Sequence, residues 1–146
     1  SVEALTPMVL CVFPREQLWK LYSEHPSLAY DLTWLASRSE RLLDDHLLSV
    51  GRRTALERVA FVIHEIFRRA SEIKMAEGRQ LRIPITQQHL GDALGLSLVH
   101  TNKTLKQLVD RKILKWKAGS MEVLDIAKLA DIAEIEAVAP ALRPLI

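Results

Sequence analysis

The chain has 146 residues, of which 49% are hydrophobic, and 20 lysines and arginines stand against 18 aspartates and glutamates. A chain of this length and composition can bury a real core, which excludes a disordered protein. It contains no signal peptide and no run of eighteen uncharged apolar residues, and one cysteine excludes an internal disulfide. We therefore expect a cytoplasmic protein without a membrane-spanning segment, in which Cys11 is a buried, inert thiol.

The first third of the chain predicts a strand followed by two helices. Residues 1–13 contain the apolar run MVLCVF and are interpreted as the end of a strand region. Residues 14–25 predict a short helix that begins at its proline, because proline suits the first helical turn. A longer helix is expected over residues 26–50, ending before Gly51.

The long predicted helix carries leucines at alternating spacings of four and three residues. Such a seam is typical of a short coiled coil. Ser39 and His46 occupy two later positions of the repeat, where polar residues can fix the register of two helices at some loss of stability. The expected dimer-interface residues are Leu28, Leu32, Leu35, Leu42 and Leu43.

Residues 54–76 predict a third helix, which begins with a capping box because Glu57 follows Thr54 at a spacing of three. Its wide apolar face should back the core. That face comprises Leu56, Val59, Ala60, Ile63, Ile66, Phe67 and Ala70. The alternating residues 81–85 predict a short edge strand.

The most informative stretch is residues 86–106, which predicts two short helices separated by a tight turn. Thr86 is a good N-cap for the first helix, Gly95 can adopt the left-handed conformation that ends it, and Ser97 can cap the second. The second helix is apolar on one side, at Thr101, Leu105 and Leu108. Its other side carries Leu98, Val99, Asn102, Lys103 and Lys106. This arrangement is typical of a helix-turn-helix that reads DNA.

A β-hairpin, or wing, is expected next, because strand-like residues 113–116 and 121–125 flank a glycine turn. Positive charge concentrates in the same region. Residues 97–118 contain six basic residues and one acidic residue, a net charge of +5, whereas residues 119–146 contain two basic and five acidic residues, a net charge of −3. The coincidence of this charge with the outer face of the second helix favours a phosphate-binding surface.

On the segments GRRTALERVA and IPITQQHLGDALGLSLVHTNKTLKQLVDRKIL, the chain resembles the carboxy-terminal half of the Crp/Fnr family of bacterial transcription regulators. The resemblance extends over essentially the whole chain and implies a mainly α fold with a small β component. Residues 1–25 would be the remnant of a β-roll effector domain, and residues 26–53 the dimerisation helix and hinge. Residues 54–146 would form the winged helix-turn-helix DNA-binding domain, with a final short helix over 125–134.

The resemblance also implies individual roles in DNA binding. Leu98 and Val99 fall where relatives read base edges, and here they can make only apolar contacts, for instance with thymine methyl groups. The later base-reading arginine of the family falls on Lys103, which lacks the planar fork of arginine, and Asn102 lies beside it. The expected phosphate contacts are Thr86, Gln88, Ser97, Lys106, Lys117 and Ser120.

Structural readings of the same residues stay open. Thr86 and Ser97 are useful as helix caps whatever else they do, and Leu98 and Val99 could instead pack against the hairpin. The lysines could be ordinary exposed residues. His89 and His100 are interpreted as surface or cap residues, because no second metal ligand lies at a persuasive spacing.

Together these patterns predict a homodimeric regulator that inserts the helix of residues 97–111 into the major groove of an imperfect DNA palindrome. The alternative is a winged-helix module that binds an acidic protein through the +5 segment. Duplex DNA, a second copy of the chain and RNA polymerase are the implied partners, although no polymerase-contacting surface can be read from the sequence. No catalytic triad, metal spacing, paired carboxylates or phosphate loop occurs, which argues against an enzyme, a metal and a cofactor. The effector of the full-length protein stays unassigned.

Overall fold

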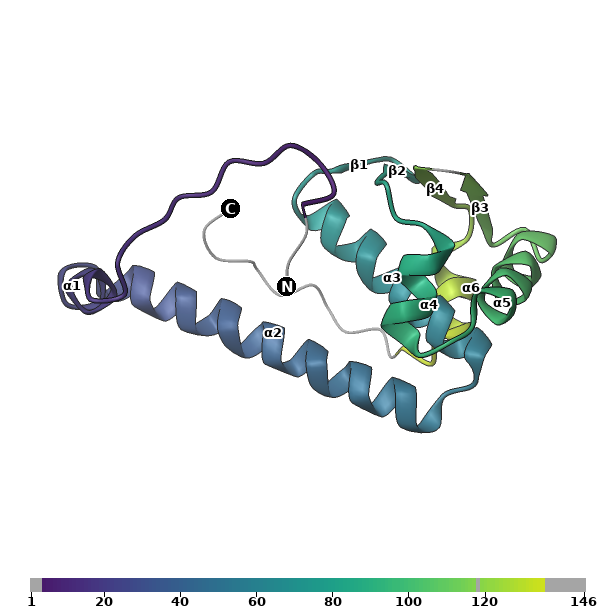
Figure 1. The fold of residues 1–146 in the computed structure, drawn as a ribbon, viewed down its shortest axis with the longest axis horizontal. Coiled ribbons are helices and arrows are strands. Elements are labelled where there is room, and N and C mark those ends of the chain that lie inside the picture. Colours follow the sequence, from purple (N-terminus) through teal and green to yellow (C-terminus); the bar gives the residue numbers. More distant parts are fainter. Residues whose placement is uncertain (1–3, 118, 136–146) are drawn as a thin grey trace. The chain divides into compact units, whose positions relative to one another are not determined.

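A computed structural model describes residues 4–117 and 119–135. The chain divides into two compact units, one reaching to Leu47 and the other starting at Leu48. The fold is mainly helical with one small antiparallel sheet, which confirms the predicted fold class (Figure 1). Within the described ranges, no helix is both long and apolar enough to cross a membrane.

Residues 4–13 of the first unit form no strand, so the strand predicted at the start of the chain is wrong over these residues. A strand needs a neighbour to pair its backbone N–H and C=O groups, and no described residue pairs with this segment. Val9 and Val12 are 95% and 92% exposed. Cys11 between them is also exposed, so the expectation of a buried thiol is wrong.

Two helices follow in the chain. Helix α1 (Gln17–Glu24) begins three residues later than predicted, because Pro14 contributes a turn in which its carbonyl accepts a hydrogen bond from the backbone N–H of Gln17 at 3.0 Å. Helix α2 (Pro26–Arg52) is the predicted long helix. It continues through Gly51, since one glycine weakens a helix by only about 1 kcal/mol and does not end it.

Helix α3 (Ala55–Glu72) has the predicted capping box. The Thr54 hydroxyl accepts a hydrogen bond from the backbone N–H of Glu57 at 3.4 Å, and the Glu57 carboxylate accepts one from the Thr54 N–H at 2.8 Å. The buried face is wider than the expected stripe, because Phe61 and Val62 are buried as well. The guanidinium of Arg53 lies 4.5 Å from the centre of the Phe61 ring, and so covers part of this extra apolar surface.

The sheet consists of β1 (Ala76–Glu77), β2 (Gln80–Arg82), β3 (Leu114–Lys117) and β4 (Ser120–Val123), in the order β1-β2-β4-β3. β3 and β4 are the predicted wing. The strand expected at the edge over residues 81–85 is wrong in position and length: β2 lies inside the sheet, between β1 and β4. It ends before Pro84, which has no N–H to donate to a ladder. Gly78, with φ +60, reverses the chain so that β1 pairs with the edge of β2 that faces away from β4.

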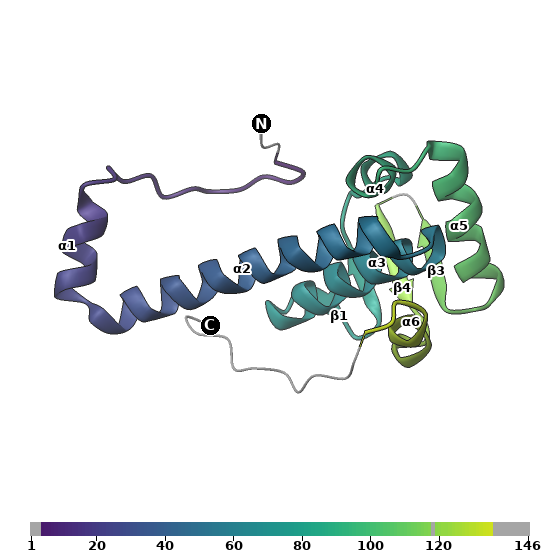
Figure 2. The ribbon, with the colours of Figure 1, turned by 90° about the horizontal axis from the view of Figure 1, so that it is seen from below.

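The core of the second unit is shared by α3, α4 (Gln87–Leu94), α5 (Leu98–Asp110), α6 (Ile126–Ile132) and one face of the sheet. Each contributes fully or almost fully buried side chains, among them Ile63, Leu90, Leu108, Leu129, Leu81 and Met121. Trp116 packs partly buried against this core and so anchors the wing. Figures 1 and 2 both place α5 at the outer edge of this unit, which leaves one side of the helix uncovered.

Candidate nucleic-acid interface

Three local signals hold α4 and α5 in a helix-turn-helix, as predicted. The Thr86 hydroxyl accepts a hydrogen bond from the His89 N–H at 3.2 Å, while Nδ1 of His89 accepts one from the Thr86 N–H at 3.3 Å. Gly95 ends α4 in the left-handed region, with φ 64 and ψ 34. The Ser97 hydroxyl then accepts a hydrogen bond from the His100 N–H at 3.3 Å, which starts α5. His89 is therefore a cap residue.

Gly91 lets the two helices approach closely, a role that the sequence analysis did not assign. Its carbonyl accepts a hydrogen bond from the N–H of Leu96 at 2.9 Å. A Cβ atom on Gly91 would lie 2.9 Å from the Leu96 carbonyl oxygen and 3.1 Å from the Thr101 hydroxyl. Thr101 is fully buried, and its hydroxyl donates to the Ser97 carbonyl at 3.1 Å. Gly91 thus fixes where α5 starts relative to α4. A glycine inside a helix was the available signal.

Helix α5 has one buried and one exposed side, as its pattern predicted. The buried side consists of Thr101, Thr104, Leu105 and Leu108. All four expected base readers lie on the exposed side: Leu98, Val99, Asn102 and Lys103. Val99 is 80% exposed and Leu98 is 44% exposed, so the hairpin leaves most of Val99 uncovered. This face has the combination of apolar, amide and cationic side chains that major-groove contacts use.

The expected phosphate contacts are distributed around α5 and do not form a single pocket. Thr86 and Gln88 lie at the start of α4, and the Gln88 amide donates to Asp92 at 2.7 Å. Ser97 begins α5 and Lys106 is exposed farther along it. Lys117 and Ser120 lie opposite each other at the end of the wing. Their roles in DNA binding stay predictions.

Residues 57–132 match the family described as the Crp-like helix-turn-helix domain. The chain belongs to the Crp/Fnr family of transcription regulators. Among curated Crp/Fnr relatives, it is 33% identical over 135 residues to the nitrogen fixation regulation protein FixK of Rhizobium meliloti, covering 92% of this chain and 54% of that protein. A probable transcriptional activator of Rhizobium leguminosarum bv. viciae is 34% identical over 113 residues, covering 77% of this chain and 46% of that protein.

The solved structure of FixK2 from Bradyrhizobium japonicum is also similar. It is 29% identical with a TM-score of 0.70, and the match covers 86% of this chain and 60% of that chain. This Crp/Fnr chain thus spans about half the length of the curated relatives it matches.

The expected dimer-interface residues of this Crp/Fnr chain all lie on α2. Leu28, Leu32, Leu35 and Leu42 are half-buried. Leu43 is 63% exposed, and Leu47, four residues farther along the same side, is 72% exposed. The apolar face of α2 therefore extends beyond the predicted set toward the end of the helix. Their part in an interface stays a prediction.

A network of charged side chains lies along α3. Arg68 donates two hydrogen bonds to the Glu65 carboxylate, at 3.0 and 2.7 Å, and it also contacts Glu72. Burial raises the pKa of Glu65, but the opposing effect of His64 and Arg68 is larger and lowers the pKa to about 2. His64 Nδ1 lies 3.7 Å from the same carboxylate, beyond ordinary hydrogen-bond distance. A carboxylate held ionised in this way serves the helix and is a poor acid or base near neutral pH.

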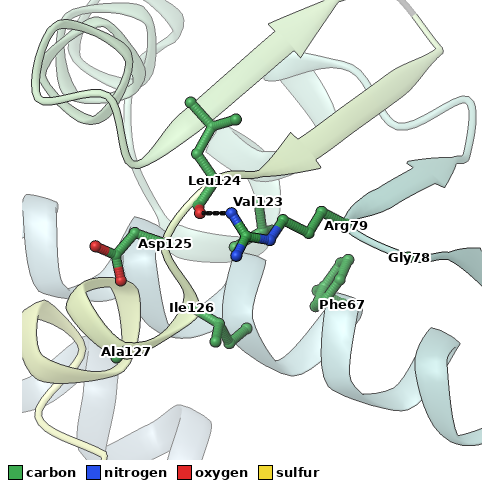
Figure 3. A pocket seen from close by; sticks show the side chains of 8 residues that line it. All are labelled: Phe67, Gly78, Arg79, Val123, Leu124, Asp125, Ile126 and Ala127. Carbon is green, nitrogen blue, oxygen red and sulfur yellow. Dashed lines mark hydrogen bonds between the residues drawn. The ribbon is translucent and has the colours of Figure 1, made fainter.

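A surface hollow lies between α3, the turn before β2 and the start of α6 (Figure 3). Arg79 reaches across it and donates a hydrogen bond to the Leu124 carbonyl at 2.6 Å. Asp125, the only carboxylate in the lining, caps α6 by accepting from the Lys128 N–H at 3.0 Å. Both ionisable lining residues therefore hold the fold, and the hollow contains no paired acid and base.

Proposed function

We propose that this chain binds duplex DNA in a sequence-specific manner, as a homodimer, and that it regulates transcription. The exposed face of α5 is the observation that supports this function. The helix is fixed on one side by four buried residues and presents Val99, Asn102, Lys103 and Lys106 on the other. An α-helix with such a face fits the major groove of B-DNA. The names of the relatives, which are regulators and activators, agree with it.

Each part of the face would contribute a different kind of contact. Lys103 can donate to the guanine acceptors O6 and N7, Asn102 suits adenine, and Leu98 and Val99 suit thymine methyl groups. The expected phosphate contacts at the start of α4, at Ser97, at Lys106 and on the wing would fix the register without reading sequence. Each neutralised phosphate releases counterions, so affinity should fall steeply as salt rises.

One helix offers too few base contacts for a specific site, which makes a dimer part of the proposal. A two-fold pair would place two copies of α5 in adjacent major grooves roughly 34 Å apart, on an imperfect palindrome. The leucines of α2 would hold that pair. Residues 1–25 as the end of an effector domain, RNA polymerase as a further partner and a cytoplasmic location also belong to this proposal.

The decisive experiment is selection of bound sequences from random duplex DNA with the wild-type chain, Lys103→Ala and Lys106→Ala. The Lys103→Ala variant should lose preference at one base pair in each half-site, with a loss of about 1–3 kcal/mol there, because it removes a base contact. The Lys106→Ala variant should weaken binding equally on all sequences, because it removes a phosphate contact. Failure of the wild type to bind any duplex, together with binding to an acidic protein, would support the protein-binding alternative instead.

A further inference from the structure

Strand pairing brings together three side chains at one end of the sheet, which we call the tip row: Arg82, Ser120 and Lys117. Arg82 of β2 lies opposite Ser120 of β4, and Ser120 lies opposite Lys117 of β3. Residues directly opposite in antiparallel strands project from the same face of a sheet. The preceding residue of β2 and the following residue of β4, Leu81 and Met121, are 0% and 2% exposed. The tip row therefore lies on the face that points away from the core.

The charge of the tip row is not neutralised within the sheet. The next row on the same face consists of Gln80, Glu122 and Lys115, and there the Lys115 ammonium lies 2.9 Å from the Glu122 carboxylate. Arg82 and Lys117 are both exposed, and neither forms an ion pair with a residue in the described part of the chain. Two cations with a hydroxyl between them thus remain available at this end of the sheet.

A short stretch of chain joins the tip row to the start of α4. Next to Arg82, the backbone N–H of Ile83 donates to the carbonyl of Gly119 in the wing turn at 3.0 Å. Thr86, the N-cap of α4, follows only four residues after Arg82. Arg82 thus pairs with the wing strand that carries Ser120 and lies four residues before Thr86, an expected phosphate contact.

We propose that Arg82 is a further DNA-backbone contact, through which the tip row holds phosphate groups beside the groove that α5 enters. This inference rests on the proposed function. The guanidinium of arginine can donate two parallel hydrogen bonds to a phosphate, and the Ser120 hydroxyl can donate one more. A contact of this kind adds affinity and orientation but reads no sequence.

The test measures the dissociation constant of the 146-residue chain for duplex DNA between 50 and 200 mM salt, on a selected palindrome and on a random duplex. Arg82→Gln should lower the slope of log affinity against log salt by about 0.9, the value for one lost phosphate contact on B-DNA. The loss of affinity should be the same factor on both duplexes. Arg79→Gln is the matched control, because it removes the same charge from the same hairpin at a side chain that is bonded to the Leu124 carbonyl.

Thermal unfolding of both variants ensures that folded protein is compared. The role of Arg82 would be overturned if Arg82→Gln kept the wild-type slope of log affinity against log salt while Lys106→Gln lowered that slope. The proposed function would then still stand. An Arg82→Gln effect at a single base pair would also overturn it, because the residue would then read a base. Absence of duplex binding by the wild type would overturn both proposals.

Discussion

Two glycines place the exposed face of α5, for different physical reasons. Gly95 has φ +64, where an L side chain is strained, but a Cβ atom there would meet nothing within 4 Å. Gly91 has an ordinary helical backbone, but a Cβ atom would lie 2.9 Å from a backbone oxygen. Backbone conformation therefore requires the first glycine, and the contact between α4 and α5 requires the second.

Substitutions at the two glycines should separate these reasons. Gly95→Ala should lower the free energy of unfolding by about 1–2 kcal/mol, the strain of one residue in the left-handed region, and leave DNA affinity nearly unchanged. Gly91→Val should lower it by about 1–3 kcal/mol through overpacking. It should also weaken specific DNA binding, because α5 must move. Urea unfolding and mobility shifts on one palindrome measure both effects. Equal DNA affinity for folded Gly91→Val and wild type would contradict the positioning role.

At this scale, the cap residues could be predicted from sequence and the close contacts could not. Thr86, Gly95 and Ser97 act through backbone groups within three or four residues, so local sequence suffices. The exposed readers on α5 followed from helical periodicity in the same way. The position of Arg82 depends on pairing with Ser120, 38 positions later in the chain, and no local pattern specifies that register.

Among the elements, α3 contains a carboxylate whose ionisation contributes to stability. The pKa of Glu65 is about 2 in the folded chain against an ordinary value of 4.5. The unfolded chain therefore binds the proton first as pH falls. The contribution of Glu65 is fully present above about pH 4.5 and is lost as pH falls toward 2.

Glu65→Gln should lower the free energy of unfolding at pH 7 by about 1–2 kcal/mol, because it replaces charge-assisted hydrogen bonds from Arg68. Urea unfolding between pH 7 and pH 2.5 should then show a weaker dependence on pH for the variant than for the wild type. Asp125 keeps part of that dependence in both proteins, since the Lys128 backbone N–H and side chain lower its pKa. Glu134→Gln, at an exposed position, is the control. Parallel pH profiles for wild type and Glu65→Gln would refute the assignment.

The helices were more predictable than the strands because their signals are periodic and local. The residues of α3, α4, α5 and α6 follow capping and apolar spacing, and the predicted wing also formed. The strand expected within residues 1–13 rested on composition alone, and composition does not provide a pairing partner. β2 is an inner strand because the two-residue strand β1 pairs with its outer edge. The predicted third helix reached residue 76 and so left no room for β1, whereas α3 ends at Glu72.

On the scale of the whole molecule, the proposed function depends on association of two chains through α2. Leu32 and Leu35 lie on the apolar face of this helix, whereas Tyr30, which is 71% exposed, lies about 160° away from Leu32 around the helix axis. A charge placed on the apolar face would have to be buried on association, and a charge at Tyr30 would stay in water.

The double variant Leu32→Asp/Leu35→Asp should therefore raise the dimer dissociation constant by at least about tenfold, or 1.4 kcal/mol. Tyr30→Asp should associate like the wild type. Sedimentation equilibrium measures the association, and mobility shifts on full palindromes and single half-sites measure its consequence for DNA. The double variant should bind both duplexes with similar weak affinity, because only a dimer can use two half-sites together. Tight binding of a single wild-type chain to one half-site would contradict the dimer, while loss of association in Tyr30→Asp would place the interface on the other side of α2.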